Sequence, residues 1–509
     1  MLGEDRRGDI RTGLGPLREP VLSGRFFGSA AAETVQRLAD FVATPASAAG
    51  LVTWFGQDTA IRLWTDRKAL RAAIDYDICQ IDVLIGRQLD AVLHAPRLKQ
   101  LEGRWRGLHW LMRSIDPSAR LRVKLLDLGW PELCRDLSRA VEFDQSHLFR
   151  FIYEGEFGMP GGEPFGLLII DHEVSHIPSA AIDDVSAIAM LSEVAAAAFV
   201  PVVLPASSKL FEVDEFADLA GSASPAAPLR SANHARWRSL AGREDMRFVC
   251  VVLPRVLARP PWRDQPGRHD GFRYVEYAPT SRQRVWMTAG YAFASCVARA
   301  FAAHSWPADV RGMERDREGG GVVLGMPIDP FGTDPAETWA RFSVELSLTD
   351  SQDRELIEAG FMPLNTIPFS REAVFSAVRS LQDPKQYTGD AATANARISA
   401  QINSILCASR FAHYLKVLGR EMVGSMGTPE EVEQRLQRWL TNYVNGNVVA
   451  SRDSRARQPL LSGRVEVTER PGQPGVFGCV IHLQPHFQLD NLSARFRLVT
   501  EIAAPGRAA

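Results

Sequence analysis

Apolar residues at helical spacing dominate the first third of the chain. Over residues 71–94 they recur every three or four positions, which predicts a long amphipathic helix. Pro96 interrupts this pattern, which resumes over 98–112. A shorter amphipathic helix is expected over 31–44, and extended backbone over 51–55 and 60–64. The first 30 residues are rich in Gly and Arg and show little periodicity, so we expect them to be flexible.

The middle of the chain alternates strand and helix patterns. We predict a buried strand over 165–171, a helix over 183–198 and a second strand over 200–204. This order is a βαβ unit, in which the two strands run parallel. Further elements are expected at 248–253 (buried strand), 281–304 (helix rich in small residues) and 121–128 (alternating strand), with a helix starting at Pro131. Residues 256–279 and 315–330 are expected to be irregular loops.

The stretch 142–170 is the most distinctive in the chain. It joins an amphipathic helix to an apolar strand through a turn rich in Gly and Pro, whose members are Pro160, Gly161, Gly162, Pro164 and Gly166. Its large apolar residues are Phe143, Leu148, Phe149, Phe151, Ile152 and Phe157. It contains no recognisable catalytic grouping, which indicates an assembly part.

The last third predicts helices followed by strands. Helices are expected over 394–423 and 429–444, the second with Thr428 as N-cap. Three extended runs follow at 464–469, 475–484 and 492–502, and the turn sequence PGQPG at 471–475 predicts a hairpin between the first two. Such a tail could pair with the edge of another chain. The simpler alternative is a hairpin that folds onto its own domain.

Together these patterns predict an α/β protein with a mixed, multi-domain organisation. A length of 509 residues is expected to give two or three domains. We divide the chain into an amino-terminal extension with a short helix (1–65), a helical and strand region (66–160), an α/β central region with Pro- and Gly-rich loops (161–390), and a helical pair with carboxy-terminal strands (391–509).

Composition excludes several classes of protein. With 58 basic and 60 acidic residues the formal charge is -2, whereas a general nucleic-acid binder needs a basic excess. The six cysteines form no C-x-x-C pair, which favours a reducing compartment. The most apolar window, 187–206, carries Glu193, Pro201 and Pro205 and so does not predict a membrane span. We see no signal peptide, and we expect a cytoplasmic protein that binds no nucleic acid and is not inserted in a membrane.

One short motif suggests metal chemistry. The sequence His172-Glu173-Val174-Ser175-His176 matches H-E-x-x-H, in which a helix presents both histidines to zinc and the glutamate acts as base. Here the motif directly follows an apolar strand, and Pro178 would end the helix within about two turns. A zinc hydrolase at 172–176, or a cofactor-dependent α/β enzyme, is therefore kept only as an alternative. We assign no catalytic, cofactor-binding or metal-binding residue and expect no cofactor.

Other polar groupings are expected to be structural. The glycines at 319–321 and Gly325 lack the G-K-[ST] ending of a P-loop and are expected to form turns. An aromatic and basic cluster on one helix (Trp105, Arg106, His109 and Trp110) is expected to be an interfacial or core face. A second set (Arg410, His413, Tyr414 and Lys416) could form a buried polar network or an ordered interface. His486 is expected to satisfy a backbone group.

Seven stretches of the chain, in order, resemble the large contractile-sheath subunit of bacterial type VI secretion systems. They are IDVLIGRQLDAVLHAPRLKQLEGRWRGLHWL, FDQSHLFRFIYEGEFGMPGGEPFGLLIIDHEVSH, WRSLAGREDMRFVCVVLPRVLARPPW, GGGVVLGMP, GFMPL, ANARISAQINSILCASRFAHYLKVLGREMVG and LQPHFQL with FRLVTEI. The first 65 residues do not match the family pattern well. Further departures at Ala258, Pro260, Trp262, Ala300 and Ser305 leave open whether this is a main or a paralogous subunit.

The resemblance implies a mixed, multi-domain sheath-subunit fold and a non-enzymatic machine part. Such a subunit forms a heterodimer with a small sheath subunit, and further copies stack in a helical tube around an inner tube protein. The tube stands on a baseplate, contracts to propel the inner tube and is dismantled by an AAA+ disassembly ATPase. The tail at 464–502 is where we expect this chain to exchange strands, so its deletion should block polymerisation. The alternative is a sheath protein of a phage-like contractile particle, which would contract by the same mechanism.

Overall fold

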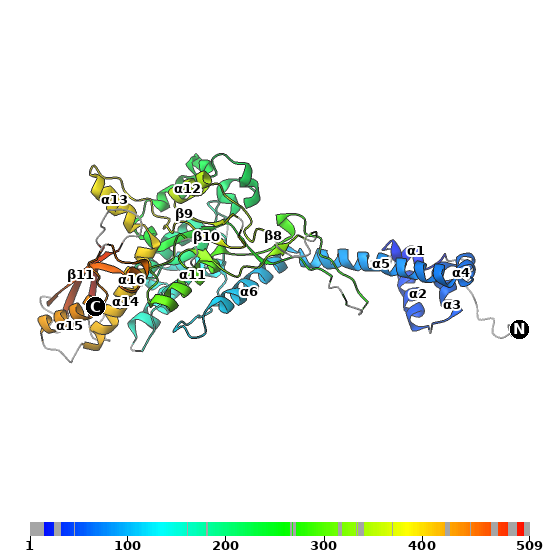
Figure 1. The fold of residues 1–509 in the computed structure, drawn as a ribbon, viewed down its shortest axis with the longest axis horizontal. Coiled ribbons are helices and arrows are strands. Elements are labelled where there is room, and N and C mark those ends of the chain that lie inside the picture. Colours follow the sequence, from blue (N-terminus) through cyan, green and yellow to red (C-terminus); the bar gives the residue numbers. More distant parts are fainter. Residues whose placement is uncertain are drawn as a thin grey trace. The chain divides into compact units, whose positions relative to one another are not determined.

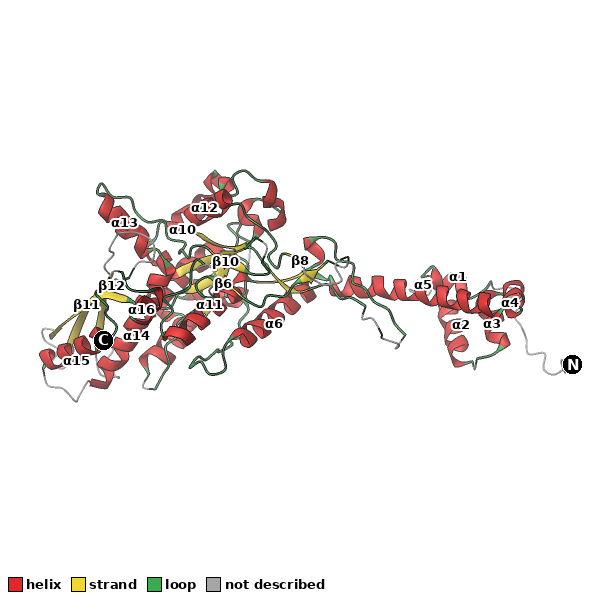
Figure 2. Ribbon diagram, viewed as in Figure 1, coloured by secondary structure: helices red, strands yellow, loops and turns green. Residues whose placement is uncertain are grey.

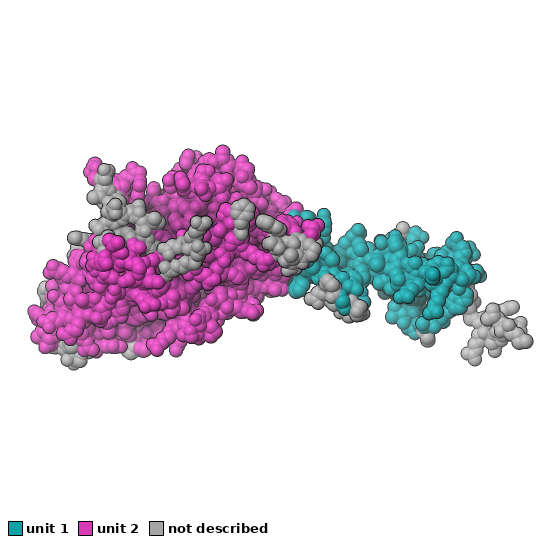
Figure 3. Space-filling view, viewed as in Figure 1, with its two compact units in different colours: residues 1–98, 261–279 teal, residues 99–260, 280–509 magenta. Residues whose placement is uncertain are grey.

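The computed structural model describes residues 15–24, 32–44, 46–159, 161–179, 182–264, 267, 271–313, 318–331, 333, 340–368, 370–422, 428–447, 449–469, 477–486 and 496–502. The chain divides into two compact units, coloured separately in Figure 3. Unit 1 comprises residues 1–98 and 261–279, and unit 2 comprises residues 99–260 and 280–509. The polypeptide therefore passes between the units three times.

Unit 1 is helical (Figure 1). Its helices are α1 (Arg18–Leu22), α2 (Ala32–Ala43), α3 (Ala48–Phe55), α4 (Gln57–Trp64) and α5 (Arg67–Leu93). The expected helices over 31–44 and 71–94 are confirmed. The expected extended segments at 51–55 and 60–64 are wrong, because both are helical. Ser47 caps the first of these two helices by accepting a hydrogen bond from the Gly50 amide at 3.3 Å, and this local stabilisation outweighs the β-branched residues.

The carboxy-terminal half of α5 is lined by the 261–279 segment. The Tyr274 hydroxyl donates to Asp90 Oδ1 at 2.6 Å, and His94 Nε2 lies 3.1 Å from Glu276 Oε1. Gly86 leaves space for the Tyr274 ring, which would lie 3.6 Å from a Cβ atom at that position.

Part of the Gly- and Arg-rich start also has structure, since Leu17 and Val21 of the α1 region are buried. Residues 1–14 and 25–30 lie outside the described residues.

Unit 2 is built on a six-stranded sheet in the order β1-β2-β3-β9-β10-β6. The strands are β1 (Leu168–Ile169), β2 (Val202–Pro205), β3 (Val249–Leu253), β6 (Val322–Val323), β9 (Phe361–Thr366) and β10 (Ala373–Phe375). The first four in this order pair in parallel and the last two antiparallel. The parallel βαβ unit is thus confirmed, with α9 (Asp184–Ala197) as its crossover helix.

Both faces of this sheet are covered, which explains its almost continuous apolar strands (Figure 2). Alternate residues of β3 enter two separate cores: Val251 lies in one with Leu191 of α9, and Cys250 lies in the other with Phe293 of α11 (Ala289–His304). Side chains of successive strand residues point to opposite faces, so a single strand serves both cores.

The other elements of unit 2 surround this sheet. The helices are α6 (Pro96–Ser114, which begins in unit 1), α7 (Trp130–Arg139), α8 (His147–Phe149), α10 (Ala235–Ala241), α12 (Asp350–Glu358), α13 (Asp390–Ser399), α14 (Ile402–Met422), α15 (Pro429–Thr441) and α16 (Arg452–Arg457). Two small hairpins pair β4 (Val256–Arg259) with β5 (Val285–Met287) and β7 (Asp329–Pro330) with β8 (Ala340–Arg341). A carboxy-terminal sheet contains β11 (Leu460–Glu469), β12 (Phe477–Pro485) and β13 (Phe496–Ile502). Short 3-10 helices lie at Phe143–Gln145, Ser208–Phe211, Phe216–Gly221, Ala227–Arg230, Ala232–His234, Glu244–Phe248 and Ser281–Gln283.

Several sequence-based boundaries are corrected. The strand expected over 165–171 has only two paired residues, and the helix expected from residue 281 begins at Ala289, after β5. The expected loops at 256–279 and 315–330 contain β4, β6 and β7. The single helix expected over 394–423 is two helices, because the backbone between them bonds elsewhere: Ser380 N donates to Ala400 O at 2.9 Å and Ile402 N to Val378 O at 3.2 Å. The strand expected over 121–128 is wrong, since these residues form no strand, and Leu128 N donates to Leu126 O at 3.1 Å.

The helix, turn and strand expected within 142–170 are all present, but residues Arg150–Gly158 of the helical part form a π-helix. The turn that follows requires its glycines. Gly161 has a φ of +79°, and a Cβ atom on Gly162 would lie 2.3 Å from the Glu156 carbonyl oxygen. Pro160 lies outside the described residues. From the side of α14, Arg420 donates to the Met159 carbonyl at 2.7 Å, so the end of the π-helix is fixed from a distant part of the chain.

Two glycines on α6 allow it to lie against β5 and α11. A Cβ atom on Gly103 would lie 2.1 Å from the Trp286 carbonyl oxygen, and one on Gly107 would lie 2.6 Å from the Tyr291 ring. We predict that Gly103→Ala lowers the free energy of unfolding of unit 2 by about 2 kcal/mol, because forced overpacking exceeds the gain in helix propensity. Denaturant unfolding would measure this loss.

The matched control is Gly86→Ala on α5, where a Cβ atom meets only ordinary contacts. That change should be neutral or stabilise by up to about 1 kcal/mol, the helix propensity difference between the two residues. Equal effects of the two substitutions would show that the close approach at Gly103 is not a constraint.

Candidate assembly surfaces

The carboxy-terminal sheet is the first candidate surface, and one of its faces is buried. Along β12 buried and half-buried residues alternate from Phe477 to Pro485, so every second side chain faces the core. Cys479 and Ile481 are fully buried there with Leu436 and Leu440 of α15. The predicted hairpin is confirmed, since β11 and β12 pair antiparallel, and it folds onto its own domain. Its turn, 471–475, lies outside the described residues.

The outer edge of β11 is closed by this chain itself. At the start of the strand, Leu460 N donates to Tyr443 O at 3.2 Å and Asn445 N donates to Leu460 O at 2.8 Å. Further along, two side chains of α15 occupy the edge. Gln437 donates to the Gly463 carbonyl at 3.0 Å and accepts from the Val465 amide at 2.9 Å. Glu433 accepts from the Val467 amide at 2.9 Å. No further strand can pair here unless these bonds break.

The opposite edge of the same sheet is different. β13 pairs antiparallel with β12 over seven residues, from Phe477↔Ile502 to Leu483↔Phe496. Within the described part of the chain, no strand pairs with the outer edge of β13. An unpaired edge presents a row of backbone donors and acceptors to which a strand of another polypeptide can add. Within the described residues, the sheet therefore has one edge that its own chain closes and one edge that has no strand partner.

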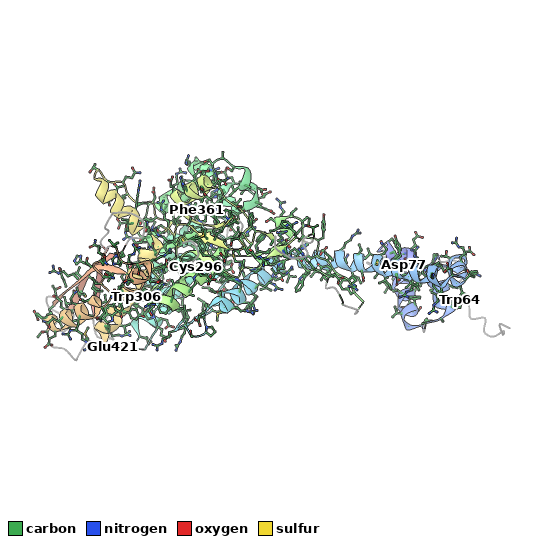
Figure 4. The ribbon with its side chains drawn as sticks, in the orientation of Figure 1. Trp64, Asp77, Cys296, Trp306, Phe361 and Glu421 are labelled. Carbon is green, nitrogen blue, oxygen red and sulfur yellow. The ribbon has the colours of Figure 1, made fainter. Side chains whose placement is uncertain are left out.

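An aromatic cluster and an ion pair fix the sheet's supporting helices to the rest of unit 2. Trp306, which is labelled in Figure 4, stacks on Phe411 of α14 with ring centroids 4.1 Å apart, and Tyr443 lies against both. Arg452 of α16 donates to Asp309 Oδ1 at 2.7 Å, and the Asp309 side chain is almost fully buried. Force applied at the sheet can therefore pass into the six-stranded core through side chains that have little room to move.

The polar residues singled out on α14 face the π-helix and α9. Lys416 Nζ lies 4.4 Å from the Tyr153 ring centroid and 4.0 Å from that of Phe157. Arg410 donates to the Tyr414 hydroxyl at 3.1 Å. His413 is 2% exposed, and its Nε2 lies 3.0 Å from the Ala198 carbonyl oxygen. Only His413 of the four is buried, and Arg410 bonds to Tyr414 while His413 and Lys416 bond to other residues, so the set does not form the single buried polar network that was one of the two expected alternatives.

His413 should make the fold sensitive to acid. Burial lowers the pKa of His413 to about 4, because the charged imidazole would lose its hydration. Since a histidine in the unfolded chain titrates near about 6.5, the unfolded state binds more protons between these two values, and stability falls as the pH falls. We predict a loss of about 3 kcal/mol from pH 7 to pH 4 that His413→Gln largely removes. Chemical unfolding at several pH values would measure it; parallel pH profiles for both proteins would contradict it.

Helix α5 of unit 1 is the second candidate surface. Among its 27 residues only Asp77 is buried, yet large apolar side chains occur along its whole length. Those that are at least 37% exposed are Ile74, Tyr76, Ile78, Val83, Ile85 and Val92. A long helix with this much exposed apolar surface is typical of an element that is covered in an assembly.

The amino-terminal part of α5 is held by a buried carboxylate. Asp77, labelled in Figure 4, is 3% exposed and accepts hydrogen bonds from Arg18 of α1 at 2.7 Å and from Trp54 of α3 at 2.9 Å. One side chain therefore joins three helices of unit 1. Sequence reasoning missed it, because Asp77 interrupts an apolar pattern as any exposed residue on the polar side of a helix would.

The residues of the H-E-x-x-H motif do not come together. The stretch is not helical, and Val174 in its centre forms a bridge with Ala206. His172 stacks on Trp130 at 4.6 Å, whereas His176 stacks on His234 at 3.7 Å. Glu173 binds Arg255 through both carboxylate oxygens, at 2.6 and 3.0 Å. Within the described residues, no group of three His, Cys, Asp or Glu side chains is placed to hold a metal ion.

The remaining candidates have structural surroundings. Gly320 and Gly325 have φ values of +59° and +66°, as expected of turns. On α6, Trp110 donates to the Gly325 carbonyl at 2.8 Å, Arg106 pairs with Glu102 at 2.7 Å, and Trp105 and His109 are exposed. The His486 amide donates to the Pro459 carbonyl at 2.9 Å. None of the helices in the described part of the chain is long and apolar enough to cross a membrane.

Comparison with known proteins gives matches along most of the chain. Residues 75–382 match the family described as EvpB/VC_A0108, tail sheath N-terminal domain, and residues 391–502 match its tail sheath gpW/gp25-like domain. The type VI secretion system sheath protein TssC1 of Pseudomonas aeruginosa is 32% identical over 435 residues, which cover 84% of this chain and 86% of that protein.

Two solved structures are also similar, although at TM-scores too low to support an argument. The sheath tail protein of Desulfitobacterium hafniense has a TM-score of 0.32 and 11% identity, over 66% of this chain and 56% of that one. A chain of the anti-feeding prophage baseplate has a TM-score of 0.30 and 12% identity, over 60% of this chain and 63% of that one. This chain thus spans less than two thirds of either.

Proposed function

This chain belongs to the large-subunit family of type VI secretion contractile sheaths, and from that premise we propose that it polymerises with a small sheath subunit around an inner tube and contracts to propel that tube. A structural sheath subunit acts through its surfaces. We accordingly propose that it catalyses no reaction, holds no cofactor and works in the cytoplasm. We also propose that the chain divides into four regions, with boundaries after residues 65, 160 and 390.

The observation that carries the proposal is the asymmetry of the carboxy-terminal sheet. Gln437 and Glu433 close the β11 edge, whereas the outer edge of β13 has no partner within the described residues. A sheet with one open edge can be extended by a neighbour's strand in one direction only. Such head-to-tail contacts do not close on themselves, and they generate helical polymers.

Contraction requires the lattice to have two arrangements of similar free energy. A rigid tail that is linked through backbone hydrogen bonds can keep neighbours joined while the bodies of the subunits move. We propose two further partners: a baseplate on which the tube stands, and an AAA+ disassembly ATPase that dismantles the tube after contraction.

Co-expression with the small sheath subunit from the same genome tests the proposal. We expect hollow tubes in electron micrographs and a stable complex of the two polypeptides on size-exclusion chromatography. Expression of each polypeptide alone is the control and should give no regular tubes. A mixture that stays as separate, folded monomers at concentrations where other sheaths assemble would contradict the proposal.

A further inference from the structure

Two side chains of α15 occupy the place that a neighbouring strand would take beside β11. Gln437 Nε2 donates to the Gly463 carbonyl at 3.0 Å, and Gln437 Oε1 accepts from the Val465 amide at 2.9 Å. One residue of a parallel strand would make the same two bonds, to the carbonyl of one β11 residue and to the amide two positions further on. Glu433 accepts a third bond, from the Val467 amide at 2.9 Å. The two side chains therefore imitate the backbone of a strand.

The spacing along helix and strand explains why these two residues fit the edge. Residues four apart on an α-helix lie on one face, separated by about 6 Å along the axis. Residues two apart on a strand direct their backbone groups to the same edge and are separated by about 6.6 Å. Glu433 and Gln437 are four apart, and the two amides from which they accept are two apart. Gly463 lets the helix come close, since a Cβ atom there would lie 2.8 Å from Leu440 Cδ2.

These bonds determine which edges of the carboxy-terminal sheet can join. A sheet with two free edges can add copies of itself without limit, because one edge of each copy pairs with the opposite edge of the next. The outer edge of β13 has no strand partner within the described residues and could supply one half of such a contact. The β11 edge would supply the other half, and α15 occupies it at Gly463, Val465 and Val467. The chain thus blocks its own second edge.

We propose that Gln437 and Glu433 prevent this chain from polymerising with itself, so that assembly has to await the companion polypeptide. The proposal rests on the open β13 edge of the proposed function and adds to it the two residues that set the direction of growth. The strand that they exclude is β13 of a second copy. That strand pairs over seven residues with β12, so it is long enough to cover the blocked positions at 463–467.

A double variant, Glu433→Ala with Gln437→Ala, tests the proposal in the purified chain without its companion. We expect sedimentable assemblies at a protein concentration about tenfold lower than the wild-type chain requires, a factor close to the free energy of one net hydrogen bond. The matched control is Glu430→Ala with Gln434→Ala, which removes the same residue types, at the same spacing, from exposed positions of α15. It should sediment as the wild type does. A folded double variant that also sediments as the wild type does would overturn the proposal.

Ending the double variant at Asp490 identifies the edge that joins the copies. This truncation removes β13, so the concentration required for sedimentation should return to the wild-type value. Assemblies that persist at the lower concentration would overturn the proposal, because the copies would then be joined elsewhere. Glu433→Gln keeps an acceptor for the Val467 amide and should leave the wild-type behaviour unchanged.

Amide hydrogen exchange of the wild-type chain tests the same contact without a substitution. The amides of Val465 and Val467 should exchange at least about tenfold more slowly than the amides on the outer edge of β13. Equally rapid exchange at both edges would overturn the proposal, because the side chains of α15 would then not close the β11 edge. Every readout uses this chain alone, so a negative result would leave the proposed tubes of the two polypeptides intact.

Discussion

A chain that ends at Asp490 should fold but should form no tubes with its companion. This truncation removes β13 (Phe496–Ile502), and with it the edge that has no partner within the described residues. The hairpin of β11 and β12 keeps its buried face on α15, and Gln437 and Glu433 still close the β11 edge. The folded body should therefore survive while the linkage to the neighbour is lost.

Electron microscopy and sedimentation of the co-expressed pair would measure the result. The matched control is a chain that ends at Ile502, which keeps β13 whole and should form normal tubes. Circular dichroism of the Asp490 truncation should retain a cooperative thermal transition, which separates loss of assembly from loss of folding. Tubes of normal length from the Asp490 chain would show that the neighbours are joined elsewhere.

Asp77→Ala should be the most damaging single substitution in unit 1. It leaves Arg18 and the Trp54 indole without the carboxylate that both of them contact, at 2.7 and 2.9 Å. The Arg18 side chain is 39% exposed and can be hydrated after the substitution, so the main loss is the unpaired Trp54 N–H, and we expect a cost of about 1–3 kcal/mol. We expect α1 and α3 to separate from α5 and the amides of 48–64 to lose protection from hydrogen exchange.

Asp75→Ala provides the control on the same helix. Its carboxylate is 66% exposed and lies 4.0 Å from Arg71, so its loss should cost no more than about 0.5 kcal/mol. Limited proteolysis should then cut the Asp77 variant, and not the Asp75 variant, within residues 15–66. Equal resistance of the two variants would contradict a structural role for the buried carboxylate.

The sequence predicted well those elements that depend on local periodicity or on segments that are neighbours along the chain. Helix α5 and the βαβ unit of β1, α9 and β2 follow from local periodicity, and Thr428 caps α15 as its sequence position indicated. The hairpin of β11 and β12 also follows from alternation and a turn sequence, because its two strands are neighbours along the chain.

The incorrect predictions have physical causes that lie outside the sequence of the segment concerned. Residues 51–55 and 60–64 contain β-branched and aromatic residues but form helices, of which Ser47 caps the first. The break between α13 and α14 depends on hydrogen bonds to residues 378 and 380. The closed edge of β11 depends on where Gln437 and Glu433 of a separate helix are placed, and an alternating strand pattern does not encode that placement.

The three passages of the chain between its two units have a mechanical consequence. They follow Leu98, Pro260 and Pro279, so one broken peptide bond cannot set unit 1 free. A protease cut within 261–279 would give two bands on a denaturing gel and a single species on a native one. Tension between the units would be divided among three covalent tethers, a redundancy that suits a component which must survive a sudden stroke.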